Sequence, residues 1–207
     1  MTIELSALPT ETRIDDATAD MLFREARTVR TFADGEVTDE QLQAAYDLAK
    51  FGPTAINTTP LRLLVVRTPE ARERLASHMA EGNQERVLTA PVSLVLAADT
   101  AFHNHIPTLA PHMSAMVPML EANDEQRRAF ATNNSWLQAG YLILALRAVG
   151  LAAGPMGIAD AAGLDADLLA GTGWTSIVVV NVAQAEGSQT PFPRAARLGW
   201  DQATQTA

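Results

Sequence analysis

The sequence predicts one compact domain in which helices are combined with a few short strands. The chain has 207 residues, of which 47% are hydrophobic and 19% are charged. This length and this balance are typical of a single domain that buries a substantial core. Two patterns predict the mixture of elements: apolar residues recur at helical spacing in several segments, and separate aliphatic runs have the length of strands.

The chain begins with a segment that gives weak structural signals. We expect residues 1–16 to form a loose arm and residues 17–26 to form a first helix, with Met21 and Leu22 directed inward.

The next helix and the first strand have clearer signals. Thr38 and Gln41 have the spacing of a capping box, and apolar residues then recur at helical spacing until Gly52-Pro53 ends the helix. Residues 61–66 are aliphatic and partly β-branched, which predicts a strand.

A third helix and a second strand follow. Thr68-Pro69 favours a helix start, and Leu75 and Met79 lie on the expected inner face of a helix that reaches residue 80. The apolar run over residues 92–98 is nearly continuous, as in a strand that is covered on both faces.

Residues 100–123 differ from the rest of the chain because they combine three prolines with three of the four histidines. We expect an irregular excursion with short helical pieces, of the kind that often forms a lid or a binding loop. His103, His105 and His112 could suggest a metal site, since His-x-His can bind metal. No carboxylate cluster lies close to them in the sequence, so we expect no metal and assign them to the lid or its surface.

The C-terminal half predicts helices and one further strand. Residues 124–133 are polar and helical in pattern, whereas residues 135–149 are apolar almost all round, which predicts a helix buried on more than one side. A subunit interface would bury such a helix. Residues 151–160 are rich in glycine and proline and predict a turn region, residues 165–170 a short helix, and residues 176–183 a strand.

Composition excludes several functional classes. Lys and Arg total 15 against 24 Asp and Glu, and the resulting charge of −9 argues against a nucleic-acid partner. The chain has no cysteine, which excludes disulfides, thiolate-bound zinc, iron–sulfur clusters and thiol nucleophiles. The N-terminus lacks the order of a signal peptide, and the most apolar stretch, residues 136–149, is shorter than a membrane span. We therefore expect a cytoplasmic protein with no membrane partner.

Two segments have the chemistry of ligand sites. Arg27-Thr28-Val29-Arg30 combines two guanidinium groups with a hydroxyl, which together are good ligands for phosphate. Arginines near the end of a helix also interact favourably with its dipole, so this pattern has a purely structural alternative. The loop over residues 52–60 offers hydroxyls and an amide to a polar heterocycle, although the same residue types are common in ordinary turns.

Three further segments have similar alternatives. Residues 82–86 (Gly-Asn-Gln-Glu-Arg) precede the second strand, and residues 154–157 (Gly-Pro-Met-Gly) are small enough for a flat ligand to lie against the main chain. Arg194 and Arg197 lie in the C-terminal tail. Each of these segments taken alone has an ordinary structural explanation.

In chain order, these segments resemble the FMN-dependent nitroreductase family, and within it the branch of small enzymes that includes malonic semialdehyde reductase. The resemblance extends from about residue 20 to residue 198. The family's Arg-Ser-x-Arg-x-Phe pattern corresponds to residues 27–32, its Gly-Pro-Ser/Thr-x-x-Asn-x-x-Pro loop to residues 52–60, its Gly-Asn-Gln-x-Lys segment to residues 82–86, and its Asn-Ser-x-x-Gln-Ala-x-Tyr-Leu helix to residues 134–142.

The resemblance implies an α+β fold with a mostly antiparallel central sheet flanked by helices, in an intertwined homodimer with two FMN sites at the subunit interface. Arg27, Thr28 and a tail arginine would hold the phosphate and ribityl chain, and Arg30 would serve there or in the dimer contact. Asn83 and Arg86 would face the polar edge of the ring, where Arg86 would have an electrostatic role. The implied cofactor-binding residues are Arg27, Thr28, Arg30, Pro53, Thr54, Asn57, Asn83, Arg86, Pro155, Met156, Gly157, Arg194 and Arg197.

Two positions depart from the family pattern. Arg86 stands where the family has lysine, which keeps the charge but adds bulk and removes the possibility of losing a proton. Ile158-Ala159 stands where close relatives have Gly-Phe, and the loss of an aromatic ring there should reshape the pocket.

The function implied by the resemblance is an FMN-dependent NAD(P)H oxidoreductase with ping-pong hydride transfer through flavin N5. NADH or NADPH would be the reductant, and the small acceptor would be a 3-oxo acid such as malonic semialdehyde, a nitroaromatic, a quinone or an enone. No side chain need act as a nucleophile, because the cofactor supplies the chemistry. Two alternatives remain open: a flavin-binding or flavin-storing dimer without physiological turnover, and a dimeric scaffold without a cofactor.

Overall fold

The computed structural model describes residues 13–184 and 193–207, and its centre is a four-stranded sheet. The strands are β1 (Leu61–Val66), β2 (Val92–Asp99), β3 (Ala152–Met156) and β4 (Trp174–Ala183). Their order is β1-β2-β4-β3, and each neighbouring pair is antiparallel. The predicted α+β fold with an antiparallel sheet is therefore confirmed.

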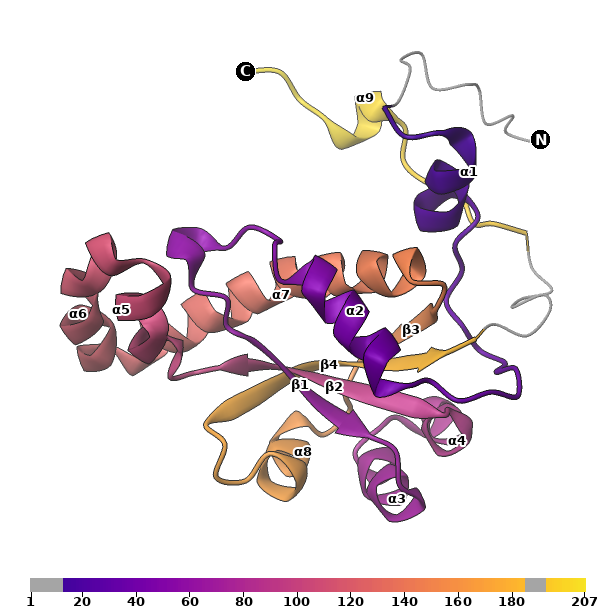
Figure 1. Cartoon of the computed structure of the whole chain (residues 1–207), viewed down its shortest axis with the longest axis horizontal. Coiled ribbons are helices and arrows are strands. Elements are labelled where there is room, and N and C mark those ends of the chain that lie inside the picture. The colour runs from indigo at the N-terminus through magenta and orange to yellow at the C-terminus, as the bar shows by residue number, and fades with distance from the viewer. Residues whose placement is uncertain (1–12, 185–192) are drawn as a thin grey trace.

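Helices cover both faces of this sheet (Figure 1). On one face lie α2 (Asp39–Ala49) and α7 (Asp124–Ala148), and on the other lie α3 (Pro69–Ser77), α4 (Glu81–Thr89) and α8 (Ala161–Leu168). Every residue of β2 is buried, as the sequence predicted for a strand covered on both sides.

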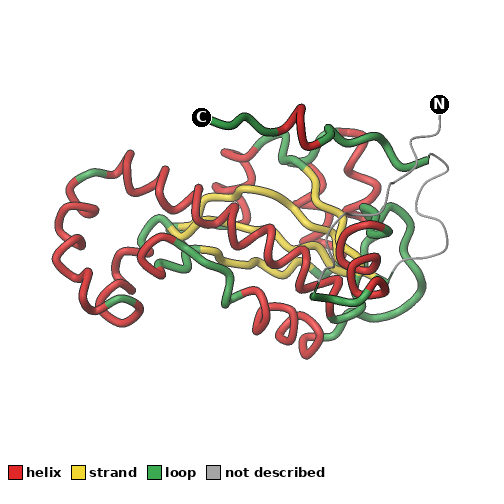
Figure 2. The backbone as a smooth tube through the Cα atoms, turned by 90° about the horizontal axis from the view of Figure 1, so that it is seen from above, coloured by secondary structure: helices red, strands yellow, loops and turns green. Residues whose placement is uncertain are grey.

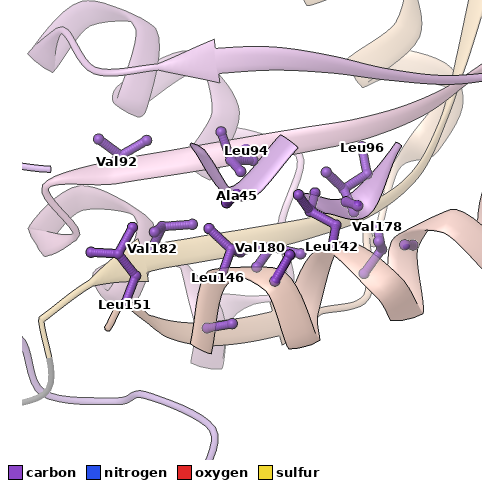
Figure 3. Close-up of a cluster of buried hydrophobic side chains, with 14 of the residues drawn as sticks. Ala45, Val92, Leu94, Leu96, Leu142, Leu146, Leu151, Val178, Val180 and Val182 are labelled. Atoms are coloured by element: carbon purple, nitrogen blue, oxygen red, sulfur yellow. The ribbon is translucent and has the colours of Figure 1, made fainter. Parts of the chain in front are cut away.

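The alternation of side chains along the strands divides the core into two layers. Leu94 and Leu96 of β2 face Leu142 and Leu146 of α7, together with Ala45 of α2 (Figure 3). The intervening positions of β2 face α3, α4 and α8 on the opposite side. The two layers fix which face of the sheet each helix occupies.

Residues 100–123 form a separate group of short helices beyond one end of the sheet (Figure 2). Their ordered pieces are two 3-10 turns, Phe102–His105 and Pro111–Met116, and the helices α5 (Ile106–Leu109) and α6 (Val117–Ala122). A small third core holds the group on α7, where the rings of Phe102 and Phe130 stack. The short helical pieces match the expectation for this excursion, and its role as a lid remains a prediction.

The structure corrects the prediction for the first helix. It consists of α1 (Asp16–Ala19) and one π-helical turn, Asp20–Arg24, rather than a regular helix over residues 17–26. Met21 is exposed and Leu22 is half-buried, because this segment contacts α7 and contributes no residue to the main core. Most of the predicted arm, residues 1–12, lies outside the described residues.

The structure also corrects two predictions in the second half of the chain. The polar and apolar helices predicted before and after residue 134 are one helix, α7, because no glycine or proline interrupts them there. The turn region predicted over residues 151–160 contains β3, whose glycine and proline concealed the strand pattern. Pro155 is tolerated because β3 is an edge strand, where a missing N–H does not break a ladder.

Three smaller differences concern the helices on the opposite face and the tail. Residues 82–86 lie inside α4, for which the polar sequence gave no clear signal. The helix predicted over residues 165–170 is α8, and it begins earlier, at Ala161, where Asp160 caps it. A last short helix, α9 (Trp200–Ala203), ends the described tail.

Candidate functional site

The most distinctive surface feature is a recess of about 400 Å³ lined by arginines, which we call the arginine recess. Its walls come from the N-terminal segment, the end of α7 and the C-terminal tail. Its lining residues are Phe23, Ala26, Arg27, Thr28, Arg30, Arg147, Arg194 and Arg197. The structure thus brings Arg27, Thr28, Arg30 and both tail arginines to one recess, and it adds Arg147, which the sequence analysis did not single out.

Backbone carbonyls join the three segments of the recess. Arg194 Nη2 donates to the carbonyl oxygen of Ala26 at 2.9 Å, and Arg147 Nη1 donates to that of Leu22 at 2.7 Å. The N–H of the buried Val29 donates to Ala153 in β3 at 3.2 Å, which holds the Arg27–Arg30 segment beside the sheet edge. The recess is therefore attached both to the sheet and to α7.

Positive charge is concentrated in the recess, because five of its eight lining residues are arginines. Other arginines of the described residues pair with carboxylates elsewhere, such as Arg74 with Asp167 and Arg128 with Asp124. Burial lowers the pKa of Arg147, and the nearby Arg194 guanidinium lowers it further. A concentration of guanidinium groups in a chain of net charge −9 favours a bound anion, and the fork geometry of arginine suits phosphate oxygens.

Asn83 and Arg86 lie on α4, which is joined to β4 through Asn181. Asn181 of β4 donates from Nδ2 to the carbonyl oxygen of Arg86 at 2.8 Å, and Arg86 Nη1 donates to Asn83 Oδ1 at 3.3 Å. Asn181 pairs in register with Gly154 of β3. A Cβ on Gly154 would lie 2.8 Å from the carbonyl oxygen of Val29, so only glycine permits this close approach.

The turn after β3 is fixed by the junction between α3 and α4. Met156 is buried, whereas the following Gly157 is exposed. Ile158 forms an isolated β-bridge with Met79, and the carbonyl oxygen of His78 accepts two N–H groups, from the two residues after Ile158. Ile158 packs beside Met79 in the core cluster, so this departure from the family pattern has a structural role.

The loop over residues 52–60 has an unusual backbone. Ile56, Asn57 and Thr59 have φ values of 49°, 53° and 39°, in the left-handed region that side chains rarely adopt. Strain of this kind concentrates at functional sites, and for a β-branched residue such as Ile56 it is uncommon. The conformation supports the prediction that this loop has a role beyond connecting α2 to β1.

Two buried amides on α7 hold this loop in place. Asn134 Oδ1 accepts the N–H of Ala55 at 2.7 Å, and Gln138 Oε1 accepts the N–H of Leu61 at 3.0 Å. Sequence reasoning gave neither residue a role. The signal was present, because the two amides stand four residues apart and therefore share one face of the helix.

Within one protomer, the loop and the arginine recess lie toward opposite ends of the molecule. In Figure 1 the segment between α2 and β1 lies near α5 and α6, whereas α1 and the C-terminal tail lie at the other end. Asn57 Nδ2 accordingly donates to the carbonyl oxygen of Leu109 in α5. The structure therefore does not bring Pro53, Thr54 and Asn57 to the recess within a single chain.

The described part of the chain offers neither a metal site nor a membrane-spanning helix. No group of three histidine or carboxylate side chains is placed to hold a metal ion within residues 13–184 and 193–207. In the same residues, no helix is long and apolar enough to cross a membrane.

The chain matches the sequence model of the nitroreductase family over residues 23–183. The chain belongs to the nitroreductase family. This match covers the arginine-bearing N-terminal segment, the strained loop and the sheet. It confirms the family resemblance, and it does not reach the tail arginines.

Relatives and solved structures agree with this membership. A Streptomyces griseus protein named NADH dehydrogenase/NAD(P)H nitroreductase is 48% identical over 193 residues, which covers 93% of this chain and 97% of that protein. Two solved structures share the nitroreductase fold at 17% identity. One is an NAD(P)H:FMN oxidoreductase from Staphylococcus epidermidis, with a TM-score of 0.81 over 97% of this chain and 100% of that one. The other is a nitroreductase in complex with FMN from Exiguobacterium sibiricum, with a TM-score of 0.79 over 96% of this chain and 100% of that one.

Proposed function

We propose that this member of the nitroreductase family is an FMN-dependent NAD(P)H oxidoreductase that reduces a small acceptor. The observation that carries the proposal is the arginine recess, whose guanidinium groups and Thr28 hydroxyl suit the phosphate of FMN. The names of the relatives add support, since one refers to NAD(P)H and one solved neighbour is a complex with FMN.

Each predicted site segment has a distinct task. Arg27, Thr28 and the tail arginines bind the phosphate and ribityl chain, with Arg30 beside them. When bound, FMN supplies hydride transfer between a reduced nicotinamide and the acceptor.

The remaining segments surround the ring. Arg86, oriented by Asn83, places a fixed positive charge at the polar edge and stabilises negative charge there. Pro155, Met156 and Gly157 offer main-chain groups to the N5 side, from a turn that the α3–α4 junction holds in place.

A second copy of the chain completes the site. The exposed side of α7 carries Trp136, Leu137 and Tyr141, and the end of α2 adds Phe51, which is 80% exposed. An apolar surface of this kind marks an interaction site. A homodimer that buries it would bring the strained loop of one protomer, with Pro53, Thr54 and Asn57, to the recess of the other.

The acceptor is proposed at the level of chemical class. The branch resemblance favours a 3-oxo acid such as malonic semialdehyde, and nitroaromatics, quinones and enones are the other candidates. Ile158 and Ala159 lie where the branch has Gly-Phe, so the pocket differs from that of its relatives there. Residues 100–123 stand near the loop as the proposed lid.

The first experiment tests the cofactor. We expect the purified protein to be yellow and to release about one FMN per chain on heating. Arg27→Gln should weaken FMN binding by roughly ten- to a hundredfold, because it removes charge-assisted hydrogen bonds to the phosphate. Arg74→Gln, on α3 and paired with Asp167 outside the proposed site, is the matched control and should keep wild-type affinity.

The second step separates an enzyme from a flavin-storing protein. Anaerobic mixing with NADH and with NADPH should bleach the bound flavin, and an acceptor panel led by malonic semialdehyde should restore its colour. Flavin that stays oxidised with both nucleotides would favour storage. A colourless protein that takes up no added FMN would contradict the proposed function altogether.

A further inference from the structure

The end of α7 supplies one arginine to the recess that none of the predicted site segments includes. Arg147 lies in the last turn of this helix and lines the recess beside Arg194. Arg147 and four other arginines place five guanidinium groups in a space of about 400 Å³: Arg27, Arg30, Arg147, Arg194 and Arg197. One phosphate monoester carries a charge of only about −1.5 to −2 at neutral pH.

The guanidinium of Arg147 is positioned but not neutralised. Its hydrogen-bond acceptor among the described residues is the carbonyl oxygen of Leu22, which occupies Nη1. A guanidinium has five N–H donors in a planar fork, so most of them remain available to a ligand or to water. The bond to Leu22 also fixes the side chain, which reduces the entropy lost when a ligand binds.

The surroundings of Arg147 make the energy of its positive charge depend on the occupant of the recess. The side chain is half-buried, and both burial and the Arg194 guanidinium disfavour its charged form, so its pKa is lowered. An anion between the two arginines converts this repulsion into two attractions. The gain grows with the charge of the anion, since Coulomb energy is proportional to that charge and is weakly screened in a partly buried site.

We propose that Arg147 is a specificity-determining residue of the recess, which it makes selective for a dianionic phosphate monoester over an uncharged head group. In terms of the proposed function, on which this inference rests, Arg147 makes the protein select FMN over riboflavin.

A purely structural role for Arg147 makes a different prediction. A cation in the last turn of a helix interacts favourably with the helix dipole, and this interaction needs no ligand. Replacing Arg147 would then lower the free energy of unfolding of the flavin-free protein. It would also weaken the binding of FMN and of riboflavin by the same factor. The phosphate-dependent part of binding is therefore the property that separates the two roles.

The test uses the full chain after removal of flavin and compares Arg147→Met, Arg147→Lys and Arg128→Met with the wild type. Arg128 is the matched control because it lies on the same helix, exposed and paired with Asp124. Two quantities are measured: dissociation constants for FMN and for riboflavin by fluorescence titration, and the thermal shift caused by inorganic phosphate at pH 8.

We expect Arg147→Met to weaken FMN binding by about tenfold, the effect of losing one charge-assisted contact, and to leave riboflavin binding within about twofold. Arg147→Lys should recover part of the loss, because it restores the charge without the fork. The phosphate-induced thermal shift should shrink in Arg147→Met and stay at the wild-type value in Arg128→Met.

Equal weakening of FMN and riboflavin, or an unchanged preference between them, would overturn the inference. If the wild type bound neither flavin, the proposed function would fail, and inorganic phosphate would then decide the role of Arg147 alone. Loss of the phosphate-induced thermal shift in Arg147→Met would support the role of Arg147 in anion selection. An equal thermal shift in Arg147→Met and the wild type would refute it.

Discussion

Single residues in this protein act mainly by placing charge and by permitting close approach. Gly154 lets β3 approach Val29, which holds the first arginine segment, and its register partner Asn181 in β4 donates to the carbonyl oxygen of Arg86. Arg86 keeps the charge of the family's lysine and reaches Asn83. Gly154 and Asn181 therefore hold the Arg27–Arg30 segment and the residue 83–86 segment at neighbouring positions of β3 and β4.

An ion pair between α3 and α8 predicts that the stability of the protein depends on pH. The Arg74 guanidinium, with a smaller effect from His78, holds the pKa of the Asp167 carboxyl below its usual value. A lowered folded-state pKa stabilises the protein above the ordinary carboxyl pKa of about 3.9, and this stabilisation is lost as the pH falls through the lower folded value.

We therefore expect Asp167→Asn to be slightly less stable than the wild type at pH 7 and to lose less stability below about pH 4. Urea unfolding at a series of pH values measures the difference. Asp201→Asn, in the exposed end of the tail, is the control and should follow the wild-type curve. Parallel plots of unfolding free energy against pH for Asp167→Asn and the wild type would show that the Arg74–Asp167 pair does not contribute to stability.

At the level of elements, α7 organises the site because its three faces have different tasks. One face packs Leu142 and Leu146 into the core, one holds the strained loop through buried amides, and one exposes apolar side chains. The sequence predicted that this helix is buried on more than one side. It did not show that Asn134 and Gln138 turn their amides toward backbone N–H groups, since partners in space are not visible in a periodicity.

The amide of Gln138 gives a prediction at this scale. Gln138→Met keeps the length of the side chain but leaves the buried N–H of Leu61 without its acceptor. We expect the free energy of unfolding to fall by about 1–3 kcal/mol, the cost of an unsatisfied buried donor. Gln43→Met, on the exposed side of α2, should change it by less than about 0.5 kcal/mol. An unchanged free energy of unfolding in Gln138→Met would mean that water replaces the amide as the acceptor.

At the level of the whole molecule, the two parts of the predicted site lie toward opposite ends of one protomer (Figure 1). The arginine recess and the turn after β3 form one part, and the strained loop forms the other. A second copy that covers the apolar side of α7 would join them, and oligomeric state and cofactor binding should then change together.

Leu137→Glu tests this coupling because Leu137 is 54% exposed on that side of α7. A buried carboxylate at the interface should shift the protein from dimer to monomer in sedimentation. FMN binding should weaken by about tenfold or more, because the cofactor loses the contacts of one protomer. Leu88→Glu, exposed on α4 across the sheet, should remain dimeric and keep its FMN. A stable wild-type monomer that binds FMN would contradict the proposed dimer.

The sequence by itself determined the parts of this protein that depend on local or periodic signals. The capping box of α2, the aliphatic runs of β1, β2 and β4, and the inward positions Leu75 and Met79 all follow from spacing along the chain. The arginine motif and the tail arginines likewise indicated an anion site, because their chemistry is independent of the fold.

Only the tertiary structure decided what depends on contacts between distant segments. β3 became a strand because β4 supplies its hydrogen bonds, although its glycine and proline disfavour a strand locally. Arg147 joined the recess because α7 ends beside the N-terminal segment, more than a hundred positions away in the chain. Met21 remained exposed for the same reason, since packing partners and not periodicity determine which side of a short helix is buried.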